Sequence, residues 1–387
     1  RDFETYFGKS LALYIMPPDE WGSAKAFIPY SPFFFIVASP LAGLPLPLEV
    51  TVPAASGTFE ALKVALVFLL APALGTSLRR DSLWAGRVAA GAAAVYAFIP
   101  ATFLLQQFGN WPTQTSLWLM TAWAAITCLF WERFTRPSVW IASTVGLTLT
   151  LLAYTVTMVY VGVFVGLMVL AGWLADGEGR RRWTALALSG IAAAALAVVI
   201  YYGRYIDDVL TSTLPTFGQA VEEQGKLTTL RPSWGAFFTD HMARAIQSYR
   251  LDLVYALGLA GTLLVFFGRG RARRAEATVT RRRQVYALVS RLPGPRIERA
   301  AWQRIWLGAW LLLFPIFTLA DFYLDQALKQ FWIALPAIAV VGAVWLISLR
   351  GWGSGSPAVR VFAWLIPAVL VWQSLSLWVF RLMFHNR

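Results

Sequence analysis

Carboxylate side chains cluster in two pairs at the start of the chain, ahead of a long apolar sequence. Asp2 with Glu4 forms the first pair, and Asp19 with Glu20 forms the second. A carboxylate can accept the proton of an attacking hydroxyl group or orient that group, so both pairs are candidates for acid–base chemistry. Simpler interpretations also stand. Charged residues near a chain end are commonly just solvated, and acidic residues that follow prolines, as Asp19 and Glu20 do, suit the start of a helix.

Signatures of soluble enzymes are absent from the sequence, which contains no GxxxxGK[ST] phosphate loop, no HExxH metal-binding helix and no GxSxG nucleophile turn. His241 and His385 are the only histidines, which argues against a histidine-rich metal site. Cys128 is the only cysteine, so an intrachain disulfide and a cysteine-based metal site are excluded. Catalysis would therefore depend on carboxylates, with Arg and Lys to neutralise an anionic substrate.

The composition is typical of a membrane protein. Of the 387 residues, 58% are hydrophobic and only 14% are charged, whereas soluble domains have about 25% charged residues. The mean hydropathy is +0.59. The net charge of +13 comes from arginines in short runs between apolar segments. This is the positive-inside pattern of a multispanning protein, and it argues against nucleic acid as a partner.

Ten segments have the apolar character of membrane-spanning helices, which need about 20 residues. They are 59–78, 84–105, 115–131, 139–154, 155–174, 184–202, 251–267, 305–319, 331–349 and 361–380. The fourth and fifth are short and divide near Tyr154. We therefore predict an all-α, polytopic helix bundle that forms a single transmembrane domain over residues 1–387.

Residues 26–48 are also apolar but contain five prolines, which remove backbone donors and disfavour a clean span. We predict an interfacial or re-entrant segment, because the basic turns then fall on one side of the membrane. With that side cytoplasmic, residues 1–58 and 203–250 are external. The basic loop 268–304 is cytoplasmic and attracts anionic lipid head groups at about 1 kcal/mol per basic residue. A chain that enters the outer face at residue 1 implies a preceding helix, and thus eleven spans in a complete protein.

The order of these features resembles the GT-C superfamily of integral-membrane glycosyltransferases. In that superfamily, a first helix leads to an external loop with an acidic residue near its start. Asp2 occupies that position here, within a DFxxY sequence that ends at Tyr6. Three further stretches resemble family features: PYSPFFFIVASPLAGLP at 29–45, FGNWPT at 108–113, and ALKQFWIALPAIAVVGA at 327–343, with Lys329 and Pro336 at the basic and proline positions. The chain departs from the family in lacking the first helix.

The resemblance implies transfer of a sugar from a polyprenyl-phosphate donor, by an inverting single displacement, at the external face of a prokaryotic plasma membrane. Asp2 would be the base, and Glu4 or the pair Asp19 and Glu20 would be the second acidic component. The phosphate leaving group needs cations; Lys329, with Arg204 or Arg250, would supply them. Tyr6 would contact the substrate. A divalent metal in the acidic loop is compatible with this reading, because some family members use one.

Two other functions remain open. A lipid-linked sugar flippase or transporter would move its substrate without breaking a bond, and would normally have polar residues in the middles of its spans. Such residues are scarce in the predicted spans. A non-catalytic membrane subunit would use the basic loop 268–304 to dock a protein partner. The sequence names neither the sugar nor the acceptor.

Overall fold

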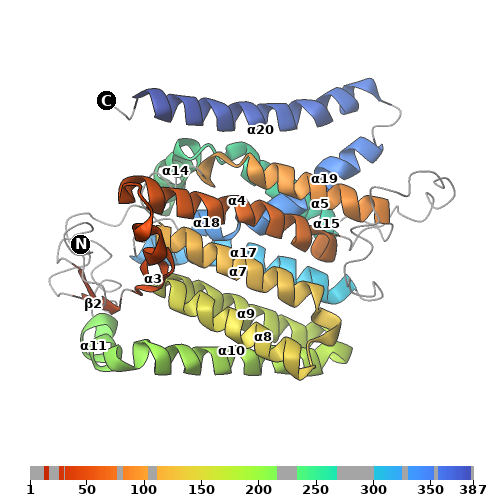
Figure 1. Cartoon of the computed structure of the whole chain (residues 1–387). Coiled ribbons are helices and arrows are strands. Elements are labelled where there is room, and N and C mark those ends of the chain that lie inside the picture. The colour runs from red at the N-terminus through yellow and green to blue at the C-terminus, as the bar shows by residue number, and fades with distance from the viewer. Residues whose placement is uncertain are drawn as a thin grey trace.

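The computed structural model is a bundle of long helices (Figure 1). It describes residues 13–16, 26–29, 31–75, 82–102, 111–215, 233–267, 300–324, 330–352 and 356–384. Within these ranges, ten helices have at least 16 residues. They are α4 (Leu48–Gly75), α5 (Ser82–Ala97), α7 (Trp111–Leu129), α8 (Pro137–Ala153), α9 (Thr155–Ala175), α10 (Arg180–Ile200), α15 (Asp252–Phe267), α17 (Ala300–Leu324), α19 (Leu335–Trp352) and α20 (Pro357–Phe384).

Each of these helices overlaps one of the ten predicted segments, and the predicted all-α bundle is confirmed. By length and apolar composition, five described helices can each cross a membrane: α4, α9, α10, α17 and α20. A sixth crossing results if the bent pair 234–248 and 252–267, whose helices meet at 105°, forms one span. The protein is thus a multi-pass membrane protein, and the count of ten spans stays a prediction.

The bundle has two chemically different ends. Successive long helices run in alternating directions, which brings the arginine-bearing turns to the right-hand end in Figure 1. Arg87 lies near the start of α5, Arg133 and Arg136 lie between α7 and α8, and Arg180–Arg182 begin α10. We call this the arginine end. That the arginine end is cytoplasmic and the opposite end external remains a prediction.

The turn between α9 and α10 shows how tightly the arginine end is packed. The Asp176 carboxylate accepts hydrogen bonds from the Gly179 backbone N–H, at 3.0 Å, and from the Trp183 indole N–H, at 3.1 Å. Gly172 is required beneath the indole, because a Cβ atom there would lie 2.1 Å from Trp183 Cδ2. The buried carboxylate thus satisfies two buried donors and fixes the angle between the two helices.

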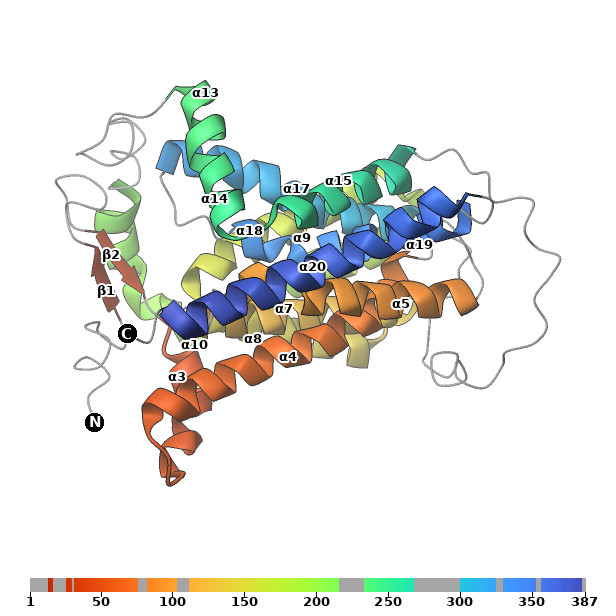
Figure 2. The same cartoon turned by 90° about the horizontal axis from the view of Figure 1, so that it is seen from above.

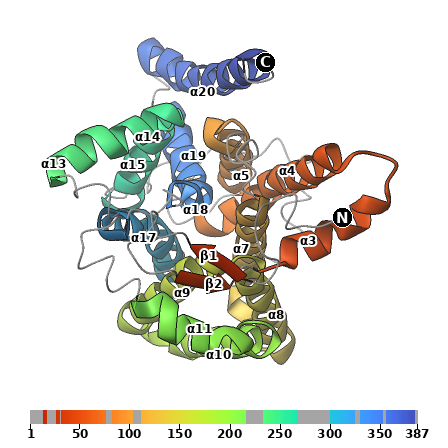
Figure 3. The same cartoon turned by 90° about the vertical axis from the view of Figure 1, so that its left-hand side faces the viewer.

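The opposite end carries short, irregular elements, and we call it the hairpin end. Strand β1 (Leu13–Met16) pairs antiparallel with β2 (Ala26–Pro29), with Met16 opposite Ala26. This hairpin was not expected in an all-α fold. Figure 3 looks onto this end and shows the hairpin in front of the bundle. The other short elements are α3 (Phe33–Ala38), η1 (Ser39–Gly43), η4 (Tyr202–Tyr205), α11 (Ile206–Asp208), η5 (Val209–Thr213), α13 (Trp234–Ala236), η6 (Phe237–Met242), α14 (Ala243–Ser248) and α18 (Gln330–Ile333).

Several boundaries differ from the sequence-based prediction. Helix α4 begins at Leu48, eleven residues before the predicted span at 59. The segment 203–250, predicted as a loop, contains short helices in its described parts. Helix α17 begins inside the predicted basic loop 268–304 and continues to Leu324, beyond the predicted end at 319. A hydropathy pattern locates apolar runs, whereas the helical hydrogen-bond ladder continues into adjoining polar residues.

Tryptophans fill the centre of the bundle near the arginine end. The Trp131 ring lies 4.4 Å from Trp183 and 5.9 Å from both Trp302 and Trp306, measured between ring centroids. All four side chains are at most 2% exposed. Aromatic pairs of this kind contribute roughly 0.5–1.5 kcal/mol beyond the area that they bury. These tryptophans therefore hold the turn after α7 together with α10 and α17.

Candidate active site

Two of the eight predicted site residues, Arg204 and Arg250, lie in the described part of the chain. The other six fall outside the described residues: Asp2, Glu4, Tyr6, Asp19, Glu20 and Lys329. The structure does describe the helices and strands that flank some of these residues in the sequence. In sequence, Asp19 and Glu20 lie between β1 and β2, and Lys329 lies between α17 and α18. These elements all lie at the hairpin end, and β2 contacts η5. The roles of the six side chains remain predictions.

Arg204 is an exposed cation held between two aromatic rings. It lies in η4, with its guanidinium carbon 5.0 Å from the Tyr201 ring centroid and 4.8 Å from that of Tyr205. Such cation–π contacts contribute about 0.5–1 kcal/mol each at exposed sites. Burial, followed by the neighbouring Tyr205, raises the pKa of the Tyr201 hydroxyl, so this ring stays neutral at physiological pH. The two tyrosine rings contact the flat face of the guanidinium, and its N–H donors, which point outward in the guanidinium plane, stay available to an anion such as phosphate.

Arg250 has an unusual backbone conformation, with φ of 53°. The Leu251 N–H donates to the Ile246 carbonyl at 2.9 Å, and the Arg250 N–H donates to the Gln247 carbonyl at 3.0 Å. This pair of hydrogen bonds is the Schellman ending of α14, whose left-handed position is usually glycine. A side chain there costs roughly 1 kcal/mol, and the exposed guanidinium is placed at the sharp bend before α15.

A buried polar network surrounds the first turn of α7 at the hairpin end. Gln114 is fully buried; its side-chain oxygen accepts a hydrogen bond from Ser56 of α4, and its amide donates to the Thr102 carbonyl at 3.5 Å. One turn further along α4, the apolar surface is interrupted again by the charged residues Glu60 and Lys63. An intrahelical ion pair joins Lys63 Nζ and Glu60 Oε2 at 2.5 Å, and its side chains are 2% and 14% exposed, respectively.

Tyr96, at the end of α5, completes this ion pair. Its hydroxyl donates to Glu60 Oε1 at 2.9 Å, and Lys63 Nζ lies 6.0 Å from its ring centroid. Each charge therefore has a partner of its own, as a buried ion pair requires. The predicted start of the span at residue 59 had placed Glu60 at a span boundary. The early start of α4 instead places both charges inside the helix. The signal that could have revealed them was the i,i+3 spacing of Glu60 and Lys63 in an apolar sequence.

A second buried network lies on the other side of the first turn of α7. Asp321, in the last turn of α17, is 2% exposed and lies within electrostatic range of Tyr160 on α9. Tyr154, at the turn between α8 and α9, also interacts with Tyr160 and forms a side-chain hydrogen bond with Thr113 of α7. Burial raises the pKa of Tyr154 to about 12. Asp321 is thus a buried carboxylate at the hairpin end, two residues beyond the predicted end of the span at 319.

Aromatic residues fix the helix end that carries Asp321. The Trp234 ring of α13 stacks on Phe322, with centroids 3.7 Å apart, and Phe237 of η6 meets Phe322 edge-on at 5.2 Å. Trp234 is 42% exposed. A partly exposed aromatic surface next to a buried carboxylate is a common feature of small-molecule sites.

The turn between α8 and α9 is a single residue, Tyr154, in extended conformation. It coincides with the predicted division of the segment 139–174. The last carbonyls of α8 lack partners within the helix. The Leu151 carbonyl accepts from the Tyr202 hydroxyl at 3.0 Å, and the Leu152 carbonyl accepts from the Ser31 hydroxyl. Ser31 and Tyr202 are thus both tied to the end of α8, next to Tyr154.

The described residues contain no group of three or more His, Cys, Asp or Glu side chains that could hold a metal ion. The acidic segment at 1–20 lies almost wholly outside them. The described arrangement provides one buried carboxylate, Asp321, and one partly buried carboxylate, Glu60. It also provides two exposed arginines, Arg204 and Arg250, towards the same end of the bundle.

Comparison with known proteins identifies the fold. No protein family model and no curated protein matches the sequence. The structure is similar to the archaeal oligosaccharyltransferase AglB from Archaeoglobus fulgidus, solved in complex with an inhibitory peptide and a dolichol-phosphate; the TM-score is 0.56 and the sequence identity 14%. The similarity covers 96% of this chain and 49% of AglB, so the chain spans about half the length of that protein. The likeness is one of fold, and it agrees with the GT-C-like helix bundle expected from the sequence.

Proposed function

We propose that this protein is a membrane glycosyltransferase that transfers a sugar from a polyprenyl-phosphate donor to an acceptor at the external face of a prokaryotic plasma membrane. The observation that carries the proposal is the GT-C-like fold, which extends over 96% of the chain and is shared with an oligosaccharyltransferase whose structure contains a dolichol-phosphate. The position of the polar networks supports it. Both networks and both exposed arginines lie at the end predicted to be external.

In the proposed reaction, the Asp2 carboxylate accepts the proton of the acceptor's hydroxyl group as the oxygen attacks the anomeric carbon of the sugar. The bond from the anomeric carbon to the phosphate oxygen breaks, and the electron pair leaves with polyprenyl phosphate. A single displacement of this kind inverts the anomeric centre. Glu4, or Asp19 with Glu20, orients the acceptor, and Tyr6 contacts the substrate.

Cations stabilise the phosphate leaving group as its charge increases in the transition state. Arg204 suits this role because its aromatic neighbours hold the guanidinium while its N–H donors stay available. Arg250 suits it because the ending of α14 fixes its position at the bend before α15. Lys329 is the third proposed cation. A divalent metal in the acidic segment would add Lewis-acid stabilisation of the phosphate.

The proposal is tested by Asp2→Asn in the complete protein. Membranes containing the protein are supplied with undecaprenyl phosphates that carry different sugars, and release of undecaprenyl phosphate is measured. Loss of a general base typically lowers the rate by about 10²–10⁴-fold. The matched control is Asp207→Asn, which removes an exposed carboxylate at the same end and should leave the rate unchanged.

Three outcomes would contradict the assignment. Unchanged release after Asp2→Asn, with loss after Asp321→Asn, would move the base to the buried carboxylate of α17. Movement of the sugar across the membrane without release of undecaprenyl phosphate would favour a flippase. Release that requires a second protein bound to the segment 268–304, and that survives Asp2→Asn, would favour a non-catalytic subunit.

A further inference from the structure

A large apolar cavity lies between α20 and the rest of the bundle, towards the arginine end. Its volume is about 710 Å³, within the roughly 300–1,000 Å³ of small-molecule sites. Residues of α5, α19 and α20 line it, together with Leu257 of α15 and Phe98, which directly follows α5. Helix α20 packs against α19 and otherwise lies along the outside of the bundle in Figures 1 and 2. The cavity thus lies between an outer helix and the rest of the bundle.

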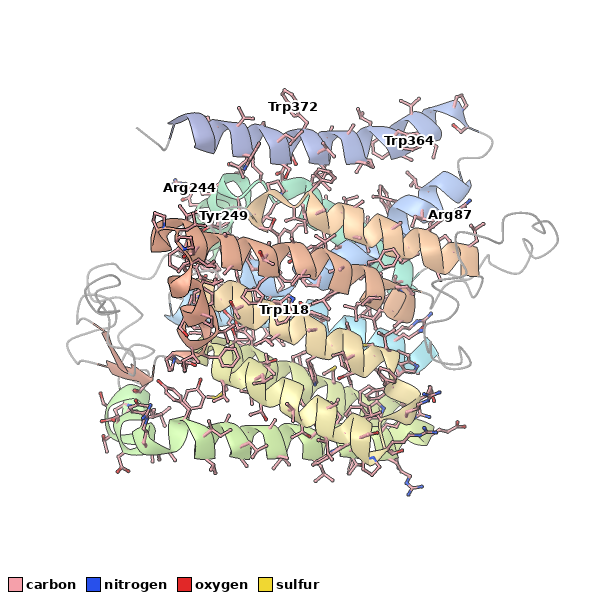
Figure 4. All side chains as sticks on the ribbon, in the orientation of Figure 1. Arg87, Trp118, Arg244, Tyr249, Trp364 and Trp372 are labelled. Carbon is pink, nitrogen blue, oxygen red and sulfur yellow. The ribbon has the colours of Figure 1, made fainter. Side chains whose placement is uncertain are left out.

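The wall formed by α5 combines small apolar residues with one cation. Arg87, Gly91, Ala94 and Phe98 line the cavity, at the three- and four-residue spacing that forms one face of a helix. Gly91 and Ala94 leave room for a ligand, and Phe98 lies at the far end. Arg87 lies at the arginine end, where Figure 4 also shows Trp364 of α20. Arg87 is exposed and forms no ion pair with any residue that the structure describes.

The other two helices of the cavity bring further arginines to the same end. Arg350 lies in the last turn of α19, three residues after Ile347, which lines the cavity. Arg360 lies in the first turn of α20, four residues before Trp364, another lining residue. Each of the three helices around the cavity thus carries an arginine near its mouth at the arginine end. Basic residues close to a membrane surface attract anionic lipid head groups.

We propose that the cavity binds one anionic phospholipid from the leaflet at the arginine end, with its phosphate on Arg87 and its acyl chains between α5, α19 and α20. The inference is independent of the proposed transferase activity. The donor phosphate of that reaction would bind at the hairpin end, the other end of the bundle, so the cavity would hold a structural lipid and not the substrate.

The size of the cavity argues against a protein segment as its occupant. A membrane-spanning helix about 30 Å long and 10 Å wide fills a cylinder on the order of 2,400 Å³. This is several times the 710 Å³ available, so a further helix would have to displace α20. Acyl chains are narrow and flexible and can follow the groove along α20.

The lipid would also complete the packing of α20. Only a narrow face of this helix, including Ala363, Ile366 and Leu370, is buried, while Trp364 is 66% and Trp372 71% exposed. Figure 4 shows Trp372 pointing away from the bundle. Because helices in a membrane associate through close packing rather than through a hydrophobic driving force, a bound lipid that bridges α5 and α20 would hold α20 in place.

The test is native mass spectrometry of the full chain released from nanodiscs that contain dioleoyl phosphatidylglycerol, dioleoyl phosphatidylcholine or undecaprenyl phosphate. The wild-type protein should retain one phosphatidylglycerol in preference to phosphatidylcholine. Arg87→Gln should weaken retention about fivefold, the effect of one basic residue beside an anionic head group, and Arg87→Lys should largely preserve it. Ala94→Trp should abolish retention by filling the cavity.

Two matched controls separate the site from general effects. Arg181→Gln removes an exposed arginine at the same end, on α10, and Ala195→Trp adds an indole to an exposed surface of α10 away from the cavity. Neither should change retention. Because Arg87 is exposed, Arg87→Gln should leave the fold intact and decides the result even if Ala94→Trp fails to fold.

Equal retention of phosphatidylcholine, or unchanged retention of phosphatidylglycerol in Arg87→Gln, would overturn the proposal. Preferential retention of undecaprenyl phosphate that Ala94→Trp abolishes would assign the cavity to a polyprenyl lipid and would also overturn it. A change from dimer to monomer in Ala94→Trp, without any effect on lipid retention, would identify a second copy of the chain as the occupant instead.

Discussion

Removing the positive charge of Lys63 should destabilise the bundle far more than its single ion pair would suggest. The side chains of Lys63 and Glu60 are 2% and 14% exposed, and Glu60 has two partners, Lys63 Nζ at 2.5 Å and the Tyr96 hydroxyl at 2.9 Å. The substitution Lys63→Met keeps the length and apolar stem of the side chain. It leaves the Glu60 carboxylate desolvated, with only one neutral donor.

The expected loss follows from this burial. Breaking a buried ion pair by removing one partner costs about 3–5 kcal/mol, because the remaining charge has no compensation. Replacing both partners removes the charge altogether. The double variant Glu60→Gln with Lys63→Met retains an acceptor for Tyr96, and should lie within about 1 kcal/mol of the wild type. The double variant should therefore be more stable than the Lys63→Met variant alone.

Equilibrium unfolding in mixed micelles measures these free energies. The control is Arg244→Met, which breaks the pair between Arg244 and Asp240 on the surface of the hairpin end. Its side chains are 77% and 61% exposed and 3.6 Å apart, so the expected loss is about 0.5 kcal/mol or less. If Lys63→Met costs no more than Arg244→Met, the pair is hydrated and the reasoning from burial is wrong. A double variant that is less stable than Lys63→Met would show that the ion pair itself is the stabilising element.

Three further predictions concern the backbone and pH. Arg250→Gly should raise the unfolding free energy by about 1 kcal/mol by removing a side chain from a left-handed position, whereas Arg250→Ala should not; equal stabilities would contradict the strain. Gly172→Ala should destabilise the protein by about 1–3 kcal/mol, because the new Cβ atom would overlap the Trp183 ring. Gly166→Ala is the control in the same helix; its Cβ atom would have no neighbouring atom within 4 Å, so it should stabilise the protein slightly. Thermal unfolding compares the two variants. Burial raises the pKa of Tyr202 to about 12. The neutral hydroxyl therefore contributes stability that is present below pH 10 and lost as pH rises towards 12; a pH series of unfolding midpoints should show a smaller loss for Tyr202→Phe.

The positions of the long helices follow from the sequence because a bilayer leaves few alternatives. Every backbone polar group must be satisfied within the segment, so an apolar run of sufficient length predicts a helix, and ten such runs coincide with ten helices. The break at Tyr154 was readable for the same reason. The extension of α4 back to Leu48 could not be predicted in this way, because Glu49 and Pro53 lower the hydropathy of residues 48–58.

The site was less predictable, because it depends on contacts between residues far apart in the chain. The contact between Glu60 and Tyr96 joins two helices, and the proximity of Asp321 to Tyr160 joins residues 161 positions apart. Nothing in the spacing of a single sequence specifies such pairs. The same holds for Trp131 and Trp306, which lie far apart in the chain and are both fully buried. The role of Asp2 remains a prediction from the resemblance alone.

The one-residue turn at Tyr154 has a consequence for how the chain is made. The carbonyls of Leu151 and Leu152 receive their donors from opposite directions along the chain, from Tyr202 and from Ser31. Ser31 leaves the ribosome before the turn, but Tyr202 follows Leu152 by 50 residues, which takes about 3–10 s at typical rates of translation. During that interval, the newly inserted pair of helices α8 and α9 has an unsatisfied carbonyl at its tip. We therefore expect water or the insertion machinery to shield this tip until α10 emerges and Tyr202 replaces them.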